Sequence, residues 1–214
     1  MDWLWTIKDF FSQLIEPDKL QVFVHAHGQL IYVVLFAIIF CETGLVVTPI
    51  LPGDSLLFTA GVVAALGDLN PVLLFVLLSV AAIAGDTVNY WIGAMIGPRA
   101  FSGKVRFLKK EHLERTHRFY EKYGGVTIII ARFIPIVRTF APFVAGIGAM
   151  NYARFILYNI VGGIAWVALF VFLGYTLGKV QFFKDHHFLI ILAIVVISVM
   201  PMVVEFLRAR RRTA

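Results

Sequence analysis

The sequence predicts an all-α integral membrane protein: an inverted repeat of two re-entrant helical hairpins, each followed by a transmembrane helix, plus a C-terminal transmembrane helix. Hydrophobic residues make up 60% of the 214 residues, against about 45–50% in soluble domains. Two stretches that are otherwise apolar each hold two prolines and charged residues, which a plain transmembrane helix does not tolerate. Ala60-Gly61 recurs as Ala145-Gly146, and further residues match at the same offset of 85, which indicates an internal duplication.

Residues 1–24 are expected to form an amphipathic segment in the membrane interface. Residues 2–15 mix bulky apolar side chains with charged and polar ones, and Pro17 ends this helix. The segment lacks the basic start and the small-residue cleavage site of a signal peptide, so we expect it to be retained. Acids outnumber Lys and Arg through residue 29, which places this end outside the cytoplasm by the positive-inside tendency.

Residues 25–97 are expected to form the first hairpin and the first transmembrane helix. The apolar run 30–41 has 12 residues, too few for the roughly 20 that cross a bilayer core, and a second short run follows at 55–66. The break between the runs holds Glu42, Pro49, Pro52, Gly53 and Asp54. Such a break between half-length runs predicts a re-entrant hairpin, with a kinked continuous span as the competing interpretation. Residues 71–97 are long enough to cross in full and contain Asp86.

Residues 124–178 repeat this plan. A second hairpin is expected around Pro135 and Pro142, because each proline removes a backbone donor and clashes with the preceding turn. A second transmembrane helix follows at 151–178. With a hairpin followed by a full span in each half, the two hairpins enter from opposite faces. Inverted repeats of this kind place transport sites near the membrane midplane.

The net charge of +6 is concentrated in two places. Eight Lys and Arg fall in residues 98–123, which we expect to be a basic cytoplasmic loop, and four fall in the basic tail 207–214. Residues 188–206 are expected to form the last transmembrane helix, which leaves the C-terminus in the cytoplasm. Basic clusters beside apolar spans are typical of topology signals and of contacts with anionic lipids, so we expect no nucleic-acid binding.

Five charged side chains lie well inside apolar segments: Glu42, Asp54, Asp86, Arg132 and Arg138. A charge at the bilayer centre costs about 2.5–3.5 kcal/mol on insertion scales, so these groups must pair or share a hydrated cavity. Three acids against two arginines leave one negative charge in surplus. In one interpretation, Glu42 or Asp54 binds and releases a proton as the coupling group of a proton-driven transporter. In the other, the charges form a structural ion-pair network that closes the hairpins and carries nothing.

The two arginines indicate the chemistry of a ligand. A guanidinium group is always charged and grips phosphate or carboxylate with two parallel hydrogen bonds. Half-helices that begin near Ser55 and Thr139 would also present unpaired backbone N–H groups to an anion. Arg132 and Arg138 beside a broken helix therefore predict an anion site, and the apolar surroundings favour a phosphate headgroup on a long lipid tail.

The sequence carries no signal for a metal, a cofactor or a catalytic site. Cys41 is the only cysteine, which excludes an intramolecular disulfide and a paired-cysteine site. The pairs His25/His27 and His186/His187 have no further ligands near them in the sequence, so we expect no metal ion. The nucleotide-binding pattern GxxxxGK[ST], the esterase pattern GxSxG and the zinc-protease pattern HExxH do not occur. We therefore expect neither a cofactor nor enzymatic activity.

Three motifs together resemble the bacterial DedA family of inner-membrane proteins, which is related to the VTT-domain lipid scramblases of eukaryotes: ETGLVVTPILPGDSLLFTAG (42–61), GDTVNYWIG (85–93) and ARFIPIVRTFAPFVAG (131–146). The similarity runs from about residue 25 to the C-terminus. The resemblance implies two oppositely oriented re-entrant hairpins and a role in returning undecaprenyl phosphate across the inner membrane, dependent on the proton motive force. It also implies that the family's required acids correspond to Glu42 and Asp54 and its required arginines to Arg132 and Arg138.

We therefore expect a proton-linked transporter of an anionic lipid, either undecaprenyl phosphate or another anionic phospholipid, in the bacterial inner membrane. Arg132 and Arg138 would hold the phosphate, and Glu42 and Asp54 would exchange protons. The supporting residues are Asp86, Pro49, Pro52, Gly53, Pro135 and Pro142. A proton-coupled antiporter of small cations or drugs and a non-transport envelope scaffold are the alternatives, and assembly into a homo-oligomer stays open.

Overall fold

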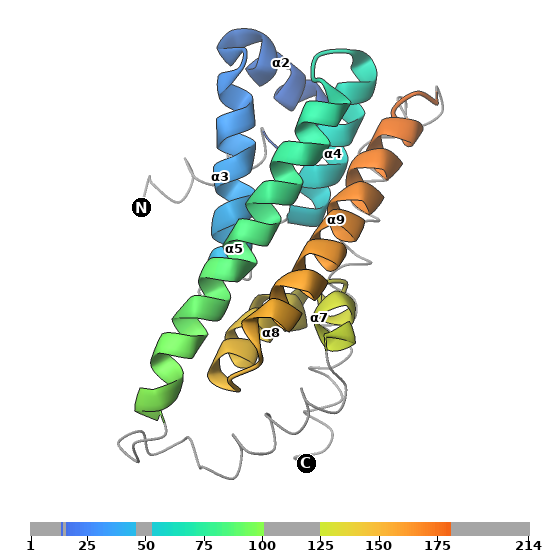
Figure 1. Cartoon of the computed structure of the whole chain (residues 1–214). Helices are drawn as coiled ribbons and strands as arrows, with labels where there is room; N and C mark the ends of the chain where they lie inside the picture. Colours follow the sequence, from blue (N-terminus) through green and yellow to red (C-terminus); the bar gives the residue numbers. More distant parts are fainter. Residues whose placement is uncertain (1–13, 15, 46–52, 101–124, 181–214) are drawn as a thin grey trace, which may run out of the picture. The chain divides into compact units, whose positions relative to one another are not determined.

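The computed structural model describes residues 14, 16–45, 53–100 and 125–180, and every regular element in these ranges is an α-helix (Figure 1). The chain divides into two compact units. Unit 1 comprises residues 1–38, 52–78 and 167–214, and unit 2 comprises residues 39–51 and 79–166. Each unit therefore combines segments from both halves of the sequence.

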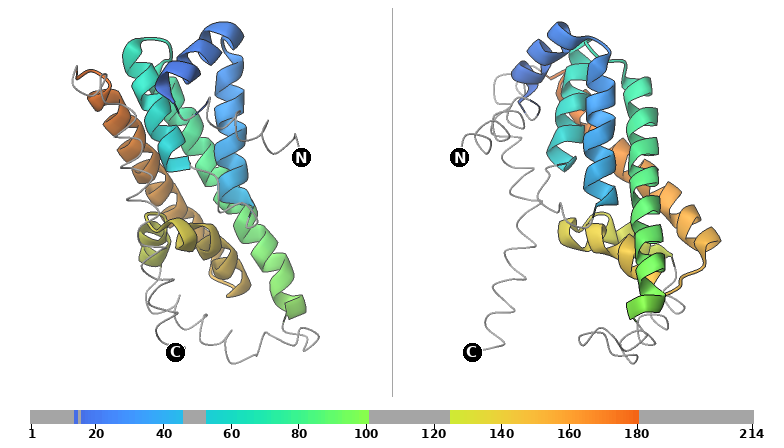
Figure 2. Two further views of the ribbon diagram at one scale, coloured as in Figure 1. Left: turned by 180° about the vertical axis from the view of Figure 1, so that it is seen from behind. Right: turned by 90° about the vertical axis from the view of Figure 1, so that its left-hand side faces the viewer.

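Helix α2 (Pro17–His27) opens the described part of unit 1. Pro17 lies in the first turn, where its missing N–H would have no partner in any case. The helix ends at Gly28, whose φ of 55° favours glycine and whose N–H donates to the Val24 carbonyl at 2.8 Å. The chain then turns into α3 (Leu30–Gly44) (Figure 2). We predicted Pro17 only as the end of a helix, and most of the predicted amphipathic segment lies outside the described residues.

Helix α4 (Gly53–Leu66) is buried along most of its length and packs on the end of α9 within unit 1. A Cβ at Gly61 would fall on the Val171 carbonyl oxygen, and one at Gly174 would fall on the Phe58 carbonyl oxygen. The two backbones are therefore in contact, as small residues allow in membrane helix pairs.

Helices α5 (Pro71–Ala100) and α9 (Tyr152–Leu177) are the long elements, and both are long and apolar enough to cross a membrane. Each begins after an asparagine. Asn70 Oδ1 accepts from the N–H groups two and three residues on, at 3.0 and 3.1 Å, and Asn151 Oδ1 does the same at 3.0 and 3.3 Å. These side chains satisfy first-turn donors that the helix cannot. The two predicted transmembrane helices are confirmed as long apolar helices.

The second predicted break forms before Pro135 only, because α8 continues through Pro142, the other proline at which a break was expected. Helix α7 (Val126–Ala131) ends in a turn at Arg132, and α8 (Pro135–Ile147) begins three residues later. Ile134 is extended, with φ −115° and ψ 106°, as expected of a residue that precedes proline. Pro142 lies inside α8. Arg132 therefore lies in the turn between the two short helices.

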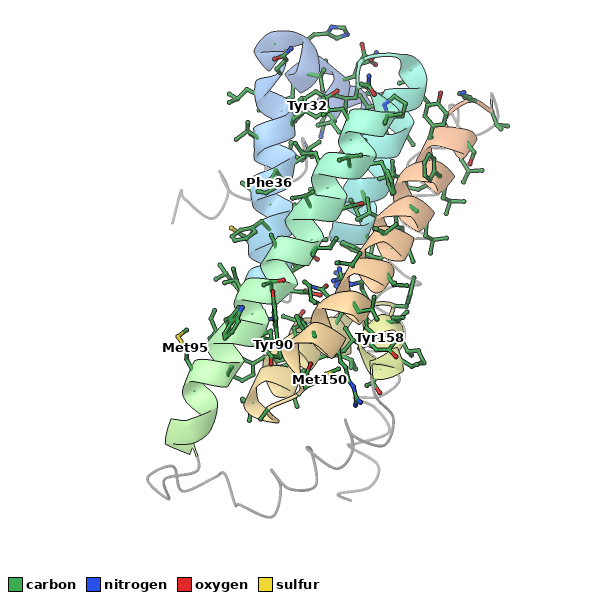
Figure 3. All side chains as sticks on the ribbon, viewed as in Figure 1. Tyr32, Phe36, Tyr90, Met95, Met150 and Tyr158 are labelled. Atoms are coloured by element: carbon green, nitrogen blue, oxygen red, sulfur yellow. The ribbon has the colours of Figure 1, made fainter. Side chains whose placement is uncertain are left out.

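Helix α8 packs on α5 within unit 2 through a second pair of glycines. A Cβ at Gly146 would fall on the Tyr90 carbonyl oxygen, and one at Gly93 would fall on the Phe143 carbonyl oxygen. The Tyr90 hydroxyl donates to the Met150 carbonyl at 2.5 Å, and its ring stacks on Phe155 with centroids 4.4 Å apart (Figure 3). Gly61 and Gly146, which match in the repeat, thus make the same kind of contact, each in its own unit.

The remaining predicted segments are the basic loop 98–123, apart from its first residues in α5, the transmembrane helix 188–206 and the tail 207–214. They lie outside the described residues.

Candidate functional site

Two buried ion pairs lie in unit 2. Nη2 of Arg132, just after α7, contacts Oδ2 of Asp86 on α5. Nη2 of Arg138, on α8, donates to Oε1 of Glu42 on α3 at 2.6 Å. All four side chains are at most 8% exposed. The structure therefore brings together four of the five charges that the sequence analysis selected.

These four charges sum to zero, which explains how unit 2 holds them away from water. Burial removes the hydration of each ion, and only a close partner with further hydrogen bonds compensates for that loss. Removing one partner of such a pair typically costs about 3–5 kcal/mol, because a buried charge is left alone. Glu42 and Asp86 are therefore bound to the fold through Arg138 and Arg132, respectively.

Asn159, on α9, holds Arg132 from a second direction. Its Oδ1 accepts from Nη2 of Arg132 at 2.5 Å, while its Nδ2 donates to the Ile83 carbonyl at 3.0 Å. Nδ2 also lies 3.4 Å from Oγ1 of Thr87. Contacts with α5 thus hold the Asn159 amide in place. Arg132 lies between two acceptors, Asn159 and Asp86.

Asn89 lies three residues after Asp86 on α5 and connects the two helices that carry the second pair. Its Nδ2 donates to the Thr43 carbonyl at 3.1 Å and to the Thr139 carbonyl at 2.8 Å. Thr43 follows Glu42, and Thr139 follows Arg138. One buried amide therefore sets the distance between the backbones that carry this acid and this arginine.

Trp166 completes the cluster. Both guanidinium groups lie over its ring, with the Cζ of Arg132 5.8 Å and the Cζ of Arg138 4.8 Å from the ring centroid. The side chain is fully buried. Because the face of an indole ring attracts cations, Trp166 keeps the two guanidinium groups close to one another.

Arg132 has donors to spare. An arginine has five N–H donors, and both of the hydrogen bonds described above leave from Nη2. Nε and Nη1 are buried and have no hydrogen-bond partner among the residues that the structure describes. A buried cation with unused donors is suited to binding an oxyanion.

The other predicted site residues that the structure describes belong to α4 and α8. Asp54 is buried in the first turn of α4, in unit 1. Gly53 begins α4, Pro135 begins α8 and Pro142 lies within α8. Pro49 and Pro52 lie outside the described residues. The groups of three or more His, Cys, Asp or Glu that hold metal ions are absent from the described ranges.

Asn89, Asn159 and Trp166 were not among the predicted site residues. A signal existed for the two asparagines, since polar side chains inside long apolar segments are expensive and tend to face the interior of the helix bundle. Trp166 had no such signal, because aromatic residues are common throughout a membrane protein.

Comparison with known proteins supports the motif resemblance. The VTT domain model matches residues 51–176. Protein DedA of Escherichia coli K12 is 48% identical over the whole chain and 98% of its own length. Inner membrane protein YqjA of the same strain is 38% identical over 74% of this chain and 72% of its own. An uncharacterized membrane protein of Mycobacterium tuberculosis H37Rv is 46% identical over 83% of this chain and 79% of its own. No solved structure matches.

Proposed function

The chain belongs to the DedA family of VTT-domain membrane proteins, and on that premise we propose that it transports an anionic lipid, specifically undecaprenyl phosphate, across the bacterial inner membrane. The observation that carries the proposal is the pair of buried arginines, each held by one carboxylate and both lying over Trp166. Such a cluster is costly to bury, and intramembrane ionisable groups commonly mark a transport pathway.

The architecture that we propose is multi-pass with two re-entrant hairpins in inverted orientation. Helices α3 and α4, in the first half of the sequence, and α7 and α8, in the second half, are each shorter than a bilayer crossing. Helices α5 and α9 are long enough to cross. The C-terminus, with its basic tail, lies in the cytoplasm under this proposal. Breaks at membrane depth are tolerated where they line a wet cavity, which is where a headgroup would pass.

Arg132 and Arg138 are the proposed phosphate ligands. A phosphate monoester carries about −1.5 to −2 charges at pH 7 and three acceptor oxygens. The unused donors of Arg132 are suited to such a group, and Trp166 keeps the second arginine beside the first. Lysine offers charge without the planar fork, so the grip depends on guanidinium itself.

Proton coupling is the second part of the proposal. The four charges of unit 2 already balance, so an added phosphate makes the site negative unless carboxylates take up protons. Glu42 and Asp54 are the proposed acids that exchange protons, with Asp86 in support. Net direction would then follow the proton gradient.

The test is lipid flipping in liposomes that contain the purified protein and fluorescent undecaprenyl phosphate, with and without a pH gradient. Arg132→Lys and Arg138→Lys keep a positive charge beside each acid, so the fold should persist while flipping falls. Arg154→Lys is the matched control, because Arg154 is exposed at the start of α9. Full flipping in both site variants, or none in well-folded wild-type protein, would contradict the proposal. In the second case, cation flux in the same vesicles tests the antiporter alternative.

A further inference from the structure

We propose that Asp86 and Arg132 form an exchangeable pair: an incoming phosphate takes the Nη2 donors of Arg132 from Asp86, and Asp86 then binds a proton. This inference rests on the proposed lipid transport and assigns the proton-linked step to a particular carboxyl group. The proposed function gives proton exchange to Glu42 and Asp54 with Asp86 in support, whereas the contacts of Arg132 assign the proton taken up on phosphate binding to Asp86.

Arg132 uses only one of its three nitrogen atoms as a hydrogen-bond donor to the described residues. Asp86 and Asn159 both contact Nη2, and Nε and Nη1 have no hydrogen-bond partner among the described residues. A guanidinium group grips an oxyanion with two parallel bonds along either of two edges, Nη1 with Nη2 or Nε with Nη2. Every such edge includes Nη2. A two-bond grip on phosphate therefore requires at least one of the present acceptors to leave.

Asp86 and Asn159 differ in the cost of losing their hydrogen bond with Arg132. Asn159 is neutral and is also held by the Ile83 carbonyl, so it has a second anchor. Asp86 is 4% exposed, and a carboxylate released there is a buried charge without its partner. Such a charge is strongly disfavoured and is relieved when the group takes up a proton. The exchange is thus an anion arriving at Arg132 together with a proton arriving at Asp86.

The charge balance supports this step. Before exchange, Arg132 and the Asp86 carboxylate sum to zero. Afterwards Arg132 and one negative charge of the phosphate sum to zero, and Asp86 is a neutral carboxylic acid whose proton came from water on the entry side. When the lipid leaves, the proton returns to water and the Asp86 carboxylate returns to Nη2. The proton on Asp86 thus balances one negative charge of the ligand.

The surroundings of Asp86 are consistent with this assignment. The charged groups that act on it are Arg132 and Arg138, and Arg138 is engaged by Glu42 from α3. The α9 residues that meet Arg132 are Asn159 and Trp166, neither of which titrates near neutral pH. Within this cluster, the proton that follows a ligand at Arg132 therefore belongs to Asp86.

The experiment measures proton uptake when a lipid binds to the full-length protein in nanodiscs. The probe is a long-chain isoprenyl phosphate methyl diester, because its single charge does not change over the working pH range. Titration calorimetry in buffers of different ionisation enthalpy gives the number of protons bound per lipid. The wild type is expected to take up about one, and its affinity should rise by up to about tenfold per unit fall in pH.

Asp86→Asn identifies the group. It should bind the diester without proton uptake and with an affinity that no longer varies with pH, while Glu42→Gln should still take up a proton. Asp18→Asn, the same change at an exposed position of α2, should behave as the wild type. Uptake that survives in Asp86→Asn, or that is lost in Glu42→Gln alone, overturns the inference. So does a wild type that binds the lipid without uptake, whereas a wild type that binds no lipid contradicts the proposed function instead.

Asp86→Glu keeps the test usable if Asp86→Asn does not fold, because it retains a carboxylate beside Arg132. If residue 86 is the group that takes up the proton, the pH midpoint of uptake shifts with the longer side chain. A midpoint identical to that of the wild type overturns the inference.

Discussion

Trp166 shows how one uncharged residue can organise two charged ones. Its ring faces both guanidinium groups from a fully buried position. Without the ring, the two arginines would be free to separate as far as their carboxylate partners allow. Trp166 therefore acts on the proposed phosphate site through Arg132 and Arg138.

Trp166→Leu should weaken lipid binding more than Trp166→Phe, because leucine has no ring face for a cation whereas phenylalanine keeps a weaker one. Cation–π contacts are worth about 0.5–2 kcal/mol, so we expect roughly a 2- to 30-fold loss of affinity for Trp166→Leu. Lipid titration of protein in nanodiscs measures this. Equal losses in the two variants would show that volume, not the ring face, matters.

Asn89→Leu should destabilise the fold, because two buried carbonyls lose their shared donor. Leaving buried polar groups unsatisfied costs about 1–3 kcal/mol each. Thermal unfolding in detergent is the measurement, and Asn89→Asp should lose less where its carboxyl group is protonated and can still donate. A melting temperature unchanged by Asn89→Leu would mean that the carbonyls of Thr43 and Thr139 find other donors.

At the residue scale, composition and position were enough to select the charges but not to pair them. Glu42, Asp86, Arg132 and Arg138 stand out because charge is rare in apolar segments. Which acid meets which arginine depends on contacts between residues 46 and 96 positions apart. No local pattern encodes such a contact. The supporting asparagines could be noticed as polar residues inside apolar segments, but their partners could not be predicted.

Among the elements, the position of the short helix α8 depends on a glycine contact as well as on its prolines. Helix α8 can approach α5 only because Gly146 and Gly93 leave the backbones room. Arg138 lies on that same short helix, so the closeness of the helix pair determines where the arginine can reach.

Gly146→Ala should reduce transport and stability, because the new methyl group would fall on the Tyr90 carbonyl and push α8 away from α5. Overpacking of this kind costs about 1–3 kcal/mol. Gly162→Ala is the comparison for stability alone, since its new Cβ would lie 3.3 Å from the Cα of Ile129 and 3.6 Å from Nε of Arg132. Thermal unfolding measures both variants, and an equal loss of stability in the two would contradict the close-packing argument.

A helix boundary could be predicted where a proline has a single meaning. Pro135, inside an apolar run, indicated a break, whereas the asparagines that cap α5 and α9 were not recognised as start signals. Pro17 was ambiguous, because proline both ends one helix and suits the first turn of the next. Helix α2 was therefore missed, although its sequence contains no other helix breaker.

For the whole molecule, the selected charges are divided between the two units. Glu42, Asp86, Arg132 and Arg138 balance one another in unit 2, and Asp54 belongs to unit 1. This division could not be predicted from the sequence, because each unit joins distant segments. The repeat itself was detectable at a fixed offset, whereas the partners of each repeated helix were not.

A charge swap separates transport from a purely structural network. Glu42→Arg combined with Arg138→Glu keeps an ion pair in unit 2, so the double variant should recover much of the stability that either single change loses. Transport should remain absent, because the cation then lies on α3 rather than α8. Recovery of both stability and flipping would favour the structural interpretation of the charges.

The glycine contacts also bear on how the chain folds during its synthesis. Helix α4, from the first half of the sequence, packs on α9 from the second, and α8 from the second half packs on α5 from the first. The first half that leaves the ribosome therefore lacks the helices on which α4 and α5 pack, so these contacts form only after the second half has been made.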